Sequence, residues 1–516
     1  MFLREVVLVA VGLGYHSPCE GGLPLKSVLL TFDRLILVLM FGCALGCQGI
    51  AIQRQDSSAA PHIVLILADD LGWGDPAGAG PDSLLETPSL DRIAAEGVRC
   101  TDAHSPSSVC TPTRYGVLTG RYAWRTRLRS GVLMGRSRAL IDADRTTLPS
   151  LLAASGYRTS GVGKWHLGLQ EKGPTDYTKP LIPGPNTVGF QRFWGIPASL
   201  DMEPYLYFED HQVVQAATEK TKASRSVRHG GAGFWRAGPI APDFRHADVL
   251  PDIGQRAVSE IERHHRVHPD EPLFLYVALS APHTPWLPDS QFDALEAAGV
   301  YGAFVAHVDA VVGEIDDALR RTQMQSRTLL VFTSDNGAHW TPADREKYPH
   351  RANGPWRGQK ADIHEGGHRV PFLMRWPGEI AGARQGQLCD ALICLTDLLP
   401  TLASAAGVTL TEAVAPDGID QLPAITRGAT PTRTSIVHHS FDGMYAIRQG
   451  PWKWIEGLGS GGFTAPRRIK AEGGPRGQLY HLHDDPAEQV NLASSHPEVV
   501  EMMQAELDRI RALETP

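Results

Sequence analysis

Three continuous apolar runs, each followed by polar residues, dominate the pattern of the chain. They cover residues 62–68, 273–279 and 328–333 and consist mainly of aliphatic and β-branched residues without alternation. Such runs are typical of strands that are buried on both faces of a parallel sheet. Residues 157–163 predict a fourth strand, which leads into Lys164-Trp165-His166.

Helices are predicted between these strands. Thr87-Pro88 and Thr147-Leu148-Pro149 each offer a threonine N-cap with a proline in the first turn, and the helices that they open should end at Gly97 and Gly156. Strands that alternate with helices predict an α/β fold with a large, mixed but mostly parallel sheet flanked by helices.

The pattern changes after about residue 415. Pro416-Asp417-Gly418 predicts a turn, and residues 445–448 and 452–455 alternate as short strands. Residues 497–513 predict an amphipathic helix that begins at Pro497. We therefore expect a main α/β domain over residues 61–415 and a smaller α+β C-terminal subdomain over residues 416–516.

The first 47 residues are predicted to be an export segment. Arg34 precedes the apolar run 35–42, which gives way to small residues ending at Cys47. The run has the length of a signal-peptide core and is too short to span a bilayer comfortably. Residues 48–60 predict a linker, and no later segment predicts an integral membrane span. These features predict an exported protein that is periplasmic, secreted or lipid-anchored.

Composition narrows the class of protein. The net charge of −8 argues against a chain built around nucleic acid, which would carry a concentrated basic face. The seven cysteines are too few and too irregularly spaced for a disulfide framework, and no Cys-x-x-Cys pair suggests a zinc site. Cys389 and Cys394 lie in the apolar run 388–394, which predicts burial as small hydrophobic residues.

Polar residues follow the ends of the predicted strands. Asp69-Asp70 come after the first run and Asp335-Asn336 after the third. Taken singly, such an aspartate often caps a helix or a turn. Because ligands bind where the carboxyl ends of parallel strands meet, the two pairs together predict a site for a divalent cation. Their oxygens are hard ligands, suited to Ca²⁺ or Mg²⁺.

Four basic residues are candidates for the same edge of the sheet. Lys164 and His166 are two apart in an extended segment, so their side chains leave the same face. His283 follows Pro282 directly after the second apolar run, and Lys360 lies in a glycine-rich stretch that permits close backbone approach. The alternatives are surface positions for Lys164, His166 and Lys360 and a structural role for His283.

The segment Cys110-Thr111-Pro112-Thr113-Arg114, followed by Leu118-Thr119-Gly120-Arg121, resembles the active-site element of the type I sulfatases. The other motifs occur in the family's order. They are Asp69-Asp70, Gly163–Gly168, Pro282-His283, Asp335–Gly337 and Glu365–Gly367. The chain thus resembles the arylsulfatases and polysaccharide sulfatases of the alkaline phosphatase superfamily from about residue 61 to its end. Thr113 stands where serine is common, and it keeps the hydroxyl.

The resemblance implies an alkaline phosphatase-like fold and a modified nucleophile. A formylglycine-generating enzyme would oxidise Cys110 to Cα-formylglycine, and one hydroxyl of the hydrated aldehyde would attack the sulfur of a sulfate ester. Loss of the second hydroxyl's proton would then expel sulfate and restore the aldehyde.

The resemblance also implies roles for the other candidates. One divalent cation, which we expect to be Ca²⁺ with Mg²⁺ as the alternative, would be held by Asp69, Asp70, Asp335 and Asn336. Arg114, Lys164 and Lys360 would neutralise the sulfate oxygens. His283, assisted by Lys360, would protonate the departing alcohol, and His166 would help to deprotonate the second hydroxyl.

The substrate implied is a sulfated carbohydrate or an aryl sulfate. One alternative is a phosphomonoester or phosphonate hydrolase of the same superfamily, although such phosphatases commonly use two zinc ions and several histidine ligands. The other alternative is a non-catalytic protein that binds a sulfated polysaccharide.

Overall fold

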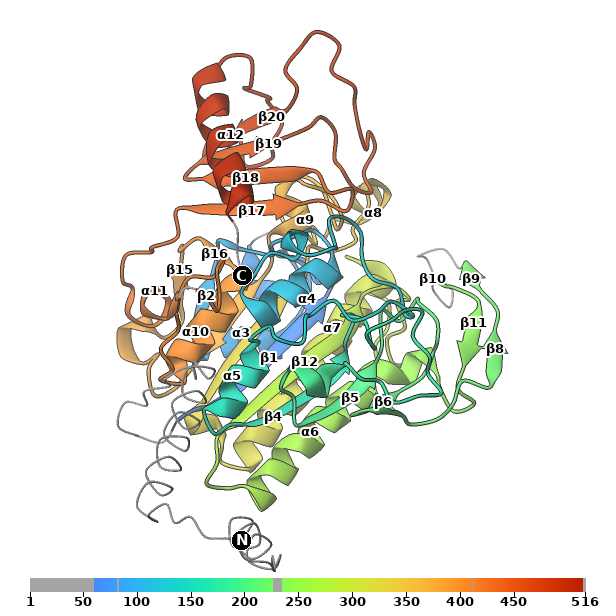
Figure 1. The fold of residues 1–516 in the computed structure, drawn as a ribbon. Coiled ribbons are helices and arrows are strands. Elements are labelled where there is room, and N and C mark those ends of the chain that lie inside the picture. The colour runs from blue at the N-terminus through green and yellow to red at the C-terminus, as the bar shows by residue number, and fades with distance from the viewer. Residues whose placement is uncertain (1–59, 81–82, 226–233, 412, 514–516) are drawn as a thin grey trace, which may run out of the picture. The chain divides into compact units, whose positions relative to one another are not determined.

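The computed structural model describes residues 60–513 apart from 81–82, 226–233 and 412 (Figure 1). The predicted export segment and all but the last residue of the predicted linker lie outside the described residues. Among the helices that are described, none combines the length and the apolar composition needed to cross a membrane.

A ten-stranded mixed sheet forms the centre of the fold, and its middle is parallel. The parallel strands are β13 (Thr328–Ser334), β1 (His62–Asp69), β12 (Leu273–Pro282), β4 (Arg158–Lys164) and β5 (Arg192–Ile196), side by side in that order. β1 lies between β12 and β13 and is buried along its whole length. The four strands predicted from the apolar pattern are therefore confirmed.

The two edges of the sheet break the parallel pattern. On one side β14 (Phe372–Arg375) runs antiparallel to β13 and to β2 (Val98–Cys100), and β15 (Gln387–Cys389) ends the sheet beside β2. On the other side β6 (Phe208–Glu209) and β7 (Gln212–Val213) are antiparallel additions to β5.

Helices cover both faces of the sheet. One group packs over the β1 face that carries Val64 and Ile66, and it contains α3 (Pro88–Glu96), α6 (Val249–Val267) and α7 (Gly299–Arg321). A second group of mutually packed helices contains α4 (Cys110–Thr119), α5 (Leu148–Ala154) and α10 (Leu398–Ala405). Thr147 caps α5 by accepting from the Ser150 backbone N–H, whereas Thr87 makes no such bond at α3.

The C-terminal part forms a four-stranded antiparallel sheet, drawn in orange and red in Figure 1. Its strands are β17 (Ser435–His439), β18 (Tyr445–Gln449), β19 (Trp452–Ile455) and β20 (Gln478–His481). Helix α12 (Pro497–Ala512) buries Met503 and Leu507 in one core cluster with Trp454. The predicted α/β fold with a smaller α+β part is confirmed, whereas the domain boundary at residues 415/416 stays a prediction.

Short elements connect these parts. They are β3 (Ala103–His104), β8 (Glu219–Thr221), β9 (Ser224–Arg225), β10 (Phe234–Trp235), β11 (Gly238–Ile240), α8 (Pro342–Lys347), α9 (Glu365–His368), β16 (Ile393–Cys394) and α11 (Leu422–Arg427).

Candidate active site

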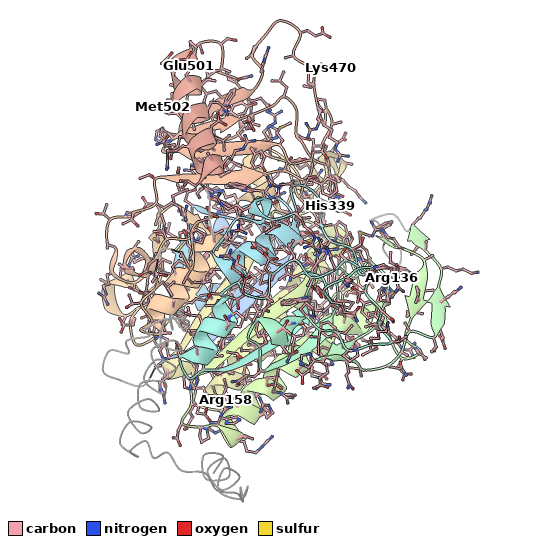
Figure 2. The ribbon with its side chains drawn as sticks, in the orientation of Figure 1. Arg136, Arg158, His339, Lys470, Glu501 and Met502 are labelled. Atoms are coloured by element: carbon pink, nitrogen blue, oxygen red, sulfur yellow. The ribbon has the colours of Figure 1, made fainter. Side chains whose placement is uncertain are left out.

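The predicted polar residues meet at one end of the parallel strands. Asp69 ends β1, Lys164 ends β4, Asp335 follows β13 and His283 follows β12, and all four side chains are buried. Figure 2 shows the polarity of the sheet: Arg158, which begins β4, lies at the far end from His339, which comes shortly after β13. This is the edge at which α/β sheets bind ligands.

The Asp69-Asp70 pair is in direct contact with the Asp335-Asn336 pair. The Asn336 amide Nδ2 donates to Asp70 Oδ1 at 2.7 Å, and the Asp70 backbone N–H donates to Asp335 Oδ1 at 3.2 Å. Asp70 adopts a left-handed conformation with φ of 67°, which turns the chain sharply where β1 ends. This turn lets two adjacent residues, Asp69 and Asp70, both face the site.

Close backbone packing fixes the position of Asn336. The Gly337 N–H donates to the Gly367 carbonyl at 3.0 Å, and a Cβ atom on Gly337 would lie 1.9 Å from the Gly366 carbonyl oxygen. Only glycine permits this approach. The glycines of the Glu365–Gly367 motif therefore support the strand end that carries the acidic pair.

Three buried cations pair with the carboxylates. Arg114 donates to Asp335 Oδ2 from Nε at 3.0 Å and from Nη2 at 2.7 Å. The Lys164 Nζ lies 2.6 Å from Asp69 Oδ2, and the Lys360 Nζ lies 2.7 Å from Asp70 Oδ2. Each pair is almost fully removed from solvent, so the side chains are held in place without competition from water.

Cys110 begins α4 and faces this cluster. Its Sγ and one oxygen each of Asp69 and Asp335 lie within 4.8 Å of one another. Burial raises the pKa of the Cys110 thiol to about 11, despite the opposing effect of Lys164 and Lys360. An unmodified thiol at this position is therefore protonated at neutral pH and is a poor nucleophile.

His283 and Ser199 lie beside the lysines of the cluster, and the sequence did not single out Ser199. The Ser199 Oγ accepts from Lys164 Nζ at 3.2 Å and lies 3.1 Å from His283 Nε2, which is itself 3.8 Å from Asp70 Oδ2. Burial, followed by the positive Lys360, lowers the pKa of His283. Ser199 lies just beyond the carboxyl end of β5, the edge of the sheet at which ligands bind. Serine is so common in loops that its position alone did not mark it as a candidate.

His166 is placed beside the cluster by a tight turn. Its φ is 56°, and its Nε2 lies 2.7 Å from the Leu133 carbonyl, so that nitrogen carries the proton and donates it. Nδ1 is buried and has no hydrogen-bond partner among the described residues. Burial, together with Lys164 and Arg114, lowers the pKa of His166 well below its usual value. The ring thus presents a free acceptor nitrogen.

The oxygen cluster fits a divalent cation. Asp69 Oδ1 and Asn336 Oδ1 are buried and accept no hydrogen bond from any described residue. Unpaired buried oxygens are costly, and a bound cation would satisfy them. The carboxylate and amide oxygens are the hard donors that Ca²⁺ and Mg²⁺ prefer.

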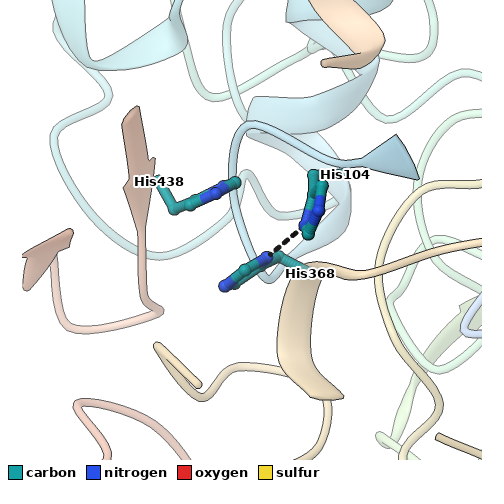
Figure 3. A group of neighbouring side chains, drawn as sticks. All are labelled: His104, His368 and His438. Carbon is teal, nitrogen blue, oxygen red and sulfur yellow. Dashed lines mark hydrogen bonds between the residues drawn. The ribbon is translucent and has the colours of Figure 1, made fainter. Parts of the chain in front are cut away.

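A second group of potential metal ligands, His104, His368 and His438, has a different explanation (Figure 3). The rings of His368 and His438 stack with centroids 3.8 Å apart and planes 12° apart. A histidine ligand holds a metal in its ring plane, at about 2.0–2.1 Å for zinc, and no single point satisfies this for two stacked rings. These side chains therefore do not form a common metal site.

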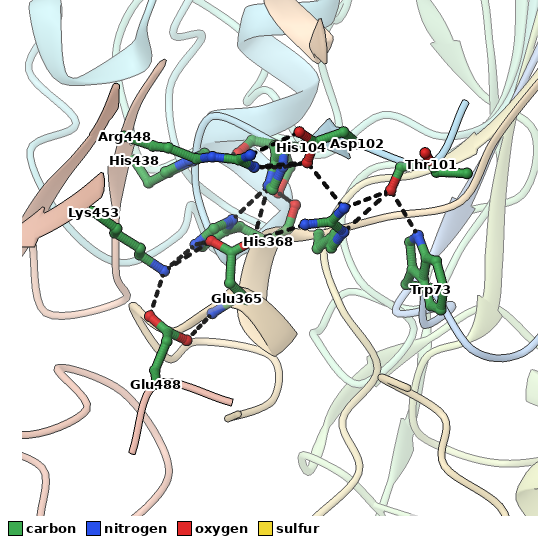
Figure 4. Close-up of polar contacts among 12 residues, drawn as sticks. Trp73, Thr101, Asp102, His104, Glu365, His368, His438, Arg448, Lys453 and Glu488 are labelled. Atoms are coloured by element: carbon green, nitrogen blue, oxygen red, sulfur yellow. Dashed lines mark hydrogen bonds and ion pairs between the residues drawn. The ribbon is translucent and has the colours of Figure 1, made fainter. Parts of the chain in front are cut away.

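The three rings instead belong to a buried hydrogen-bond network (Figure 4). One tautomer choice satisfies its central chain of bonds: Lys453 Nζ donates to His368 Nε2 at 3.0 Å, His368 Nδ1 donates to His104 Nδ1 at 3.1 Å, and His104 Nε2 donates to Asp102 Oδ1 at 2.8 Å. Burial lowers the pKa of His104 and, well below its usual value, that of His368, which keeps both rings neutral.

The same network joins the C-terminal sheet to the active-site glycine motif. Lys453 of β19 pairs with Glu365 at 3.1 Å and with Glu488 at 2.9 Å, and all three side chains are fully buried. The Glu365 backbone N–H donates to Glu488 Oε2 at 2.7 Å. Because α9 begins at Glu365 and packs beside Gly337, this triad braces the strand end that carries Asn336.

The substitution Lys453→Met should destabilise the fold strongly. It leaves Glu365 and Glu488 buried without their shared cation, and loss of one partner of a buried pair costs about 3–5 kcal/mol. Denaturant unfolding would measure the change in the free energy of unfolding. The control is Arg468→Met, which removes an exposed partner of Asp442 and should cost less than about 1 kcal/mol. A cost for Lys453→Met no larger than that of the control would contradict the bracing role.

Comparison with known proteins agrees with this geometry. The family model described as Sulfatase matches residues 61–408. An N-acetylgalactosamine-6-O-sulfatase of Bacteroides thetaiotaomicron is 31% identical over 513 residues, which cover 92% of this chain and 98% of that relative. Arylsulfatase A of Homo sapiens is 32% identical over 489 residues, which cover 89% of this chain and 90% of the relative.

Solved structures give the same result. A structure described under the metabolism of multiple glycosaminoglycans by Bacteroides thetaiotaomicron superimposes with a TM-score of 0.77 at 30% sequence identity. The match covers 88% of this chain and all of that one. The family predicted from the Cys110 segment is thereby confirmed: the chain belongs to the sulfatase family and is a sulfuric ester hydrolase.

Proposed function

We propose that this sulfatase removes sulfate from a sulfated carbohydrate outside the cytoplasm, using a Cα-formylglycine formed from Cys110 and one bound Ca²⁺. The observation that carries the proposal is the position of Cys110. Its sulfur adjoins the Asp69–Asp335 oxygens, while Arg114, Lys164 and Lys360 supply positive charge around them. With a divalent cation bound to the three carboxylates, a nucleophile at this position would meet an anion where positive charge is available to balance it.

The cation would be held by Asp69, Asp70, Asp335 and Asn336, whose oxygens converge as described. When bound, it would act as a Lewis acid on a sulfate oxygen. Its charge would also replace part of the pairing that Lys164 and Lys360 now provide to the carboxylates. The lysine side chains would then be free to contact the substrate.

The aldehyde at position 110 would supply a hydrated nucleophile with two hydroxyl groups, which a serine or cysteine side chain does not. Arg114, Lys164 and Lys360 would orient the sulfate group and offset the negative charge that develops as the sulfur–oxygen bond breaks. Because these side chains already lie at the site, only their hydrogen-bond partners would change when the sulfate group binds.

Two histidines would move protons. His283 Nε2, held by Ser199 and flanked by Lys360, would donate a proton to the departing alcohol oxygen. His166 would accept a proton at Nδ1, the nitrogen left free by the bond from Nε2 to Leu133. The two roles are distinct because the rings lie on different strand ends, β12 and β4.

The relatives guide the choice of substrate. Arylsulfatases and an N-acetylgalactosamine-6-O-sulfatase are among them, so a 6-sulfated N-acetylgalactosamine is the first compound to test, beside a generic aryl sulfate.

Peptide mass of the fragment that carries residue 110 tests the proposal directly. The protein should be produced together with a formylglycine-generating enzyme. Conversion of the thiol CH₂SH to the aldehyde CHO lowers the peptide mass by about 18 Da. Full sulfatase activity from protein that carries only unmodified Cys110 would contradict the proposed nucleophile.

The substitution Asn336→Ala should weaken Ca²⁺ binding. Wild-type protein is expected to hold one calcium per chain, and saturation to about 100 times Kd should stabilise it by about 2.7 kcal/mol. Asn336→Ala removes one of the two unpaired oxygens and should reduce both the bound calcium and the calcium-dependent rise in Tm. The control Asp484→Asn alters an exposed carboxylate and should leave both unchanged. Equal calcium binding by Asn336→Ala and the wild type would exclude this residue as a ligand.

A further inference from the structure

Two cysteines away from the active site lie side by side at one edge of the large sheet. Cys100 ends β2 and Cys389 ends β15, and the two residues are register partners in this parallel pair. Both are buried, as the sequence predicts for Cys389, and their side chains hydrogen-bond to one another. Both thiols are free in the structure.

The backbone geometry permits a covalent link. Neighbouring strands lie about 4.7–4.9 Å apart, which falls within the Cα separations of about 4.4–6.8 Å seen across disulfides. The Thr101 N–H donates to the Cys389 carbonyl at 2.8 Å, so the strands remain paired at this point. Residues in register on adjacent strands project from the same face, which directs both sulfur atoms to one side of the sheet.

We propose that Cys100 and Cys389 form a reversible disulfide that fastens the edge strand β15 to β2. The number and spacing of the cysteines predicted no disulfide framework. This single pair could not be found from spacing, because its two residues are distant in sequence and adjacent only in the sheet.

The edge strand has few other attachments. Only three register pairs join β15 to β2, and Leu388 is 58% exposed. Arg384, which precedes β15, donates to the Ile425 carbonyl of α11 at 2.8 Å, and Cys389 Sγ lies 3.9 Å from the Ala424 carbonyl of the same helix. A disulfide would close the chain between residues 100 and 389, and long closed loops restrict the unfolded chain most.

Cys389 is the reactive member of the pair. The hydrogen bond from Cys100 lowers the pKa of Cys389 to about 6, and the Ala391 N–H and the Arg384 guanidinium act in the same direction, whereas burial and Asp390 oppose it. Burial raises the pKa of Cys100 well above its usual value. These opposite shifts favour deprotonation of Cys389 before Cys100, and a thiolate beside a thiol is the form required for disulfide exchange.

The reaction needs an external disulfide such as oxidised glutathione. The Cys389 thiolate attacks one sulfur of that disulfide, which forms a mixed disulfide and releases one glutathione thiolate. Cys100 loses its proton to the released thiolate and attacks Cys389 Sγ, which expels the second glutathione thiolate. Two thiols are oxidised, one glutathione disulfide is reduced to two thiols, and the Cys100–Cys389 bond forms.

The test uses full-length, reduced protein incubated with oxidised glutathione and then alkylated. Peptide mass should show residues 100 and 389 in one linked species, about 2 Da lighter than the two free peptides together. The Tm should rise by several degrees and return to its starting value with dithiothreitol. Absence of the linked species under oxidising conditions, or a link that leaves Tm unchanged, would overturn the proposal.

Variants separate this pair from the other cysteines. Cys394→Ser changes a buried cysteine of β16 and should form the 100–389 link as the wild type does. Cys100→Ser should stop at the mixed disulfide on Cys389 and gain no stability. The wild-type measurement, with and without dithiothreitol, decides the question even where a variant folds poorly.

The pH dependence gives an independent readout. The initial rate of mixed-disulfide formation at Cys389 should rise as pH increases through about 6, because the thiolate is present above that pKa. In Cys100→Ala the hydrogen-bond donor is lost, so the midpoint should move upward, towards the value of about 8.5 for a free cysteine. An unchanged midpoint in Cys100→Ala would show that Cys100 does not act on Cys389.

Discussion

Cys110→Ala is expected to abolish sulfate ester hydrolysis while leaving the fold intact. The Cys110 sulfur adjoins the oxygens of Asp69 and Asp335, and the charges of Arg114, Lys164 and Lys360 act on it. Removal of a covalent nucleophile costs about 10⁴-fold or more in kcat. The change removes one sulfur atom at the start of α4, so Tm should move little.

Turnover of an aryl sulfate and of a 6-sulfated N-acetylgalactosamine should be measured together with Tm. Cys394→Ala is the matched control, because it removes another buried thiol far along the chain and should retain activity. Turnover at the wild-type level in Cys110→Ala would refute the mechanism. A low activity accompanied by a large fall in Tm would point to folding rather than to chemistry.

His283→Ala should have the second largest effect, and the effect should depend on the leaving group. A sugar alkoxide is a poor leaving group and needs a proton, so we expect a loss of about 10²–10⁴-fold in kcat on a carbohydrate sulfate. A 4-nitrophenolate leaves without a proton, so the loss on its sulfate should be much smaller. Steady-state kinetics on both substrates would measure this difference.

A histidine outside the site provides the control. His268, at the end of α6, pairs with Glu271, and His268→Ala should change neither rate. Equal losses on both substrates in His283→Ala would remove His283 from the acid role and leave it with a part in binding the sulfate group.

The centre of the fold and most of the site follow from local patterns in the sequence. The apolar runs at 62–68, 273–279 and 328–333 predicted strands that are buried on both faces. The structure has β1, β12 and β13 at these positions. Because parallel strands share one carboxyl edge, residues that are far apart in the chain, such as Asp70 and Asn336, were expected to meet.

Features that depend on distant partners were not predictable. The antiparallel insertion of β14 between β13 and β2 has no local signal, because antiparallel and parallel buried strands have the same composition. Nothing in the local sequence after Cys110 indicates that its arginines are paired inside the fold, yet Arg121 is buried and Arg125 is bound by Asp417. The roles of Ser199 and of the Lys453–Glu365–Glu488 triad could likewise not be predicted, because their partners are distant in the sequence.

The position of β1 between β12 and β13 has a consequence for biosynthesis. Its two neighbours end at residues 282 and 334, so an almost entirely apolar strand is made long before anything can cover its edges. At ribosomal rates of about 5–20 residues per second, the wait for β13 is on the order of ten to fifty seconds. Unpaired apolar strands are prone to aggregation during such intervals. The yield of soluble enzyme in a foreign host should therefore depend more on chaperone supply and a slow rate of induction than on the stability of the finished fold.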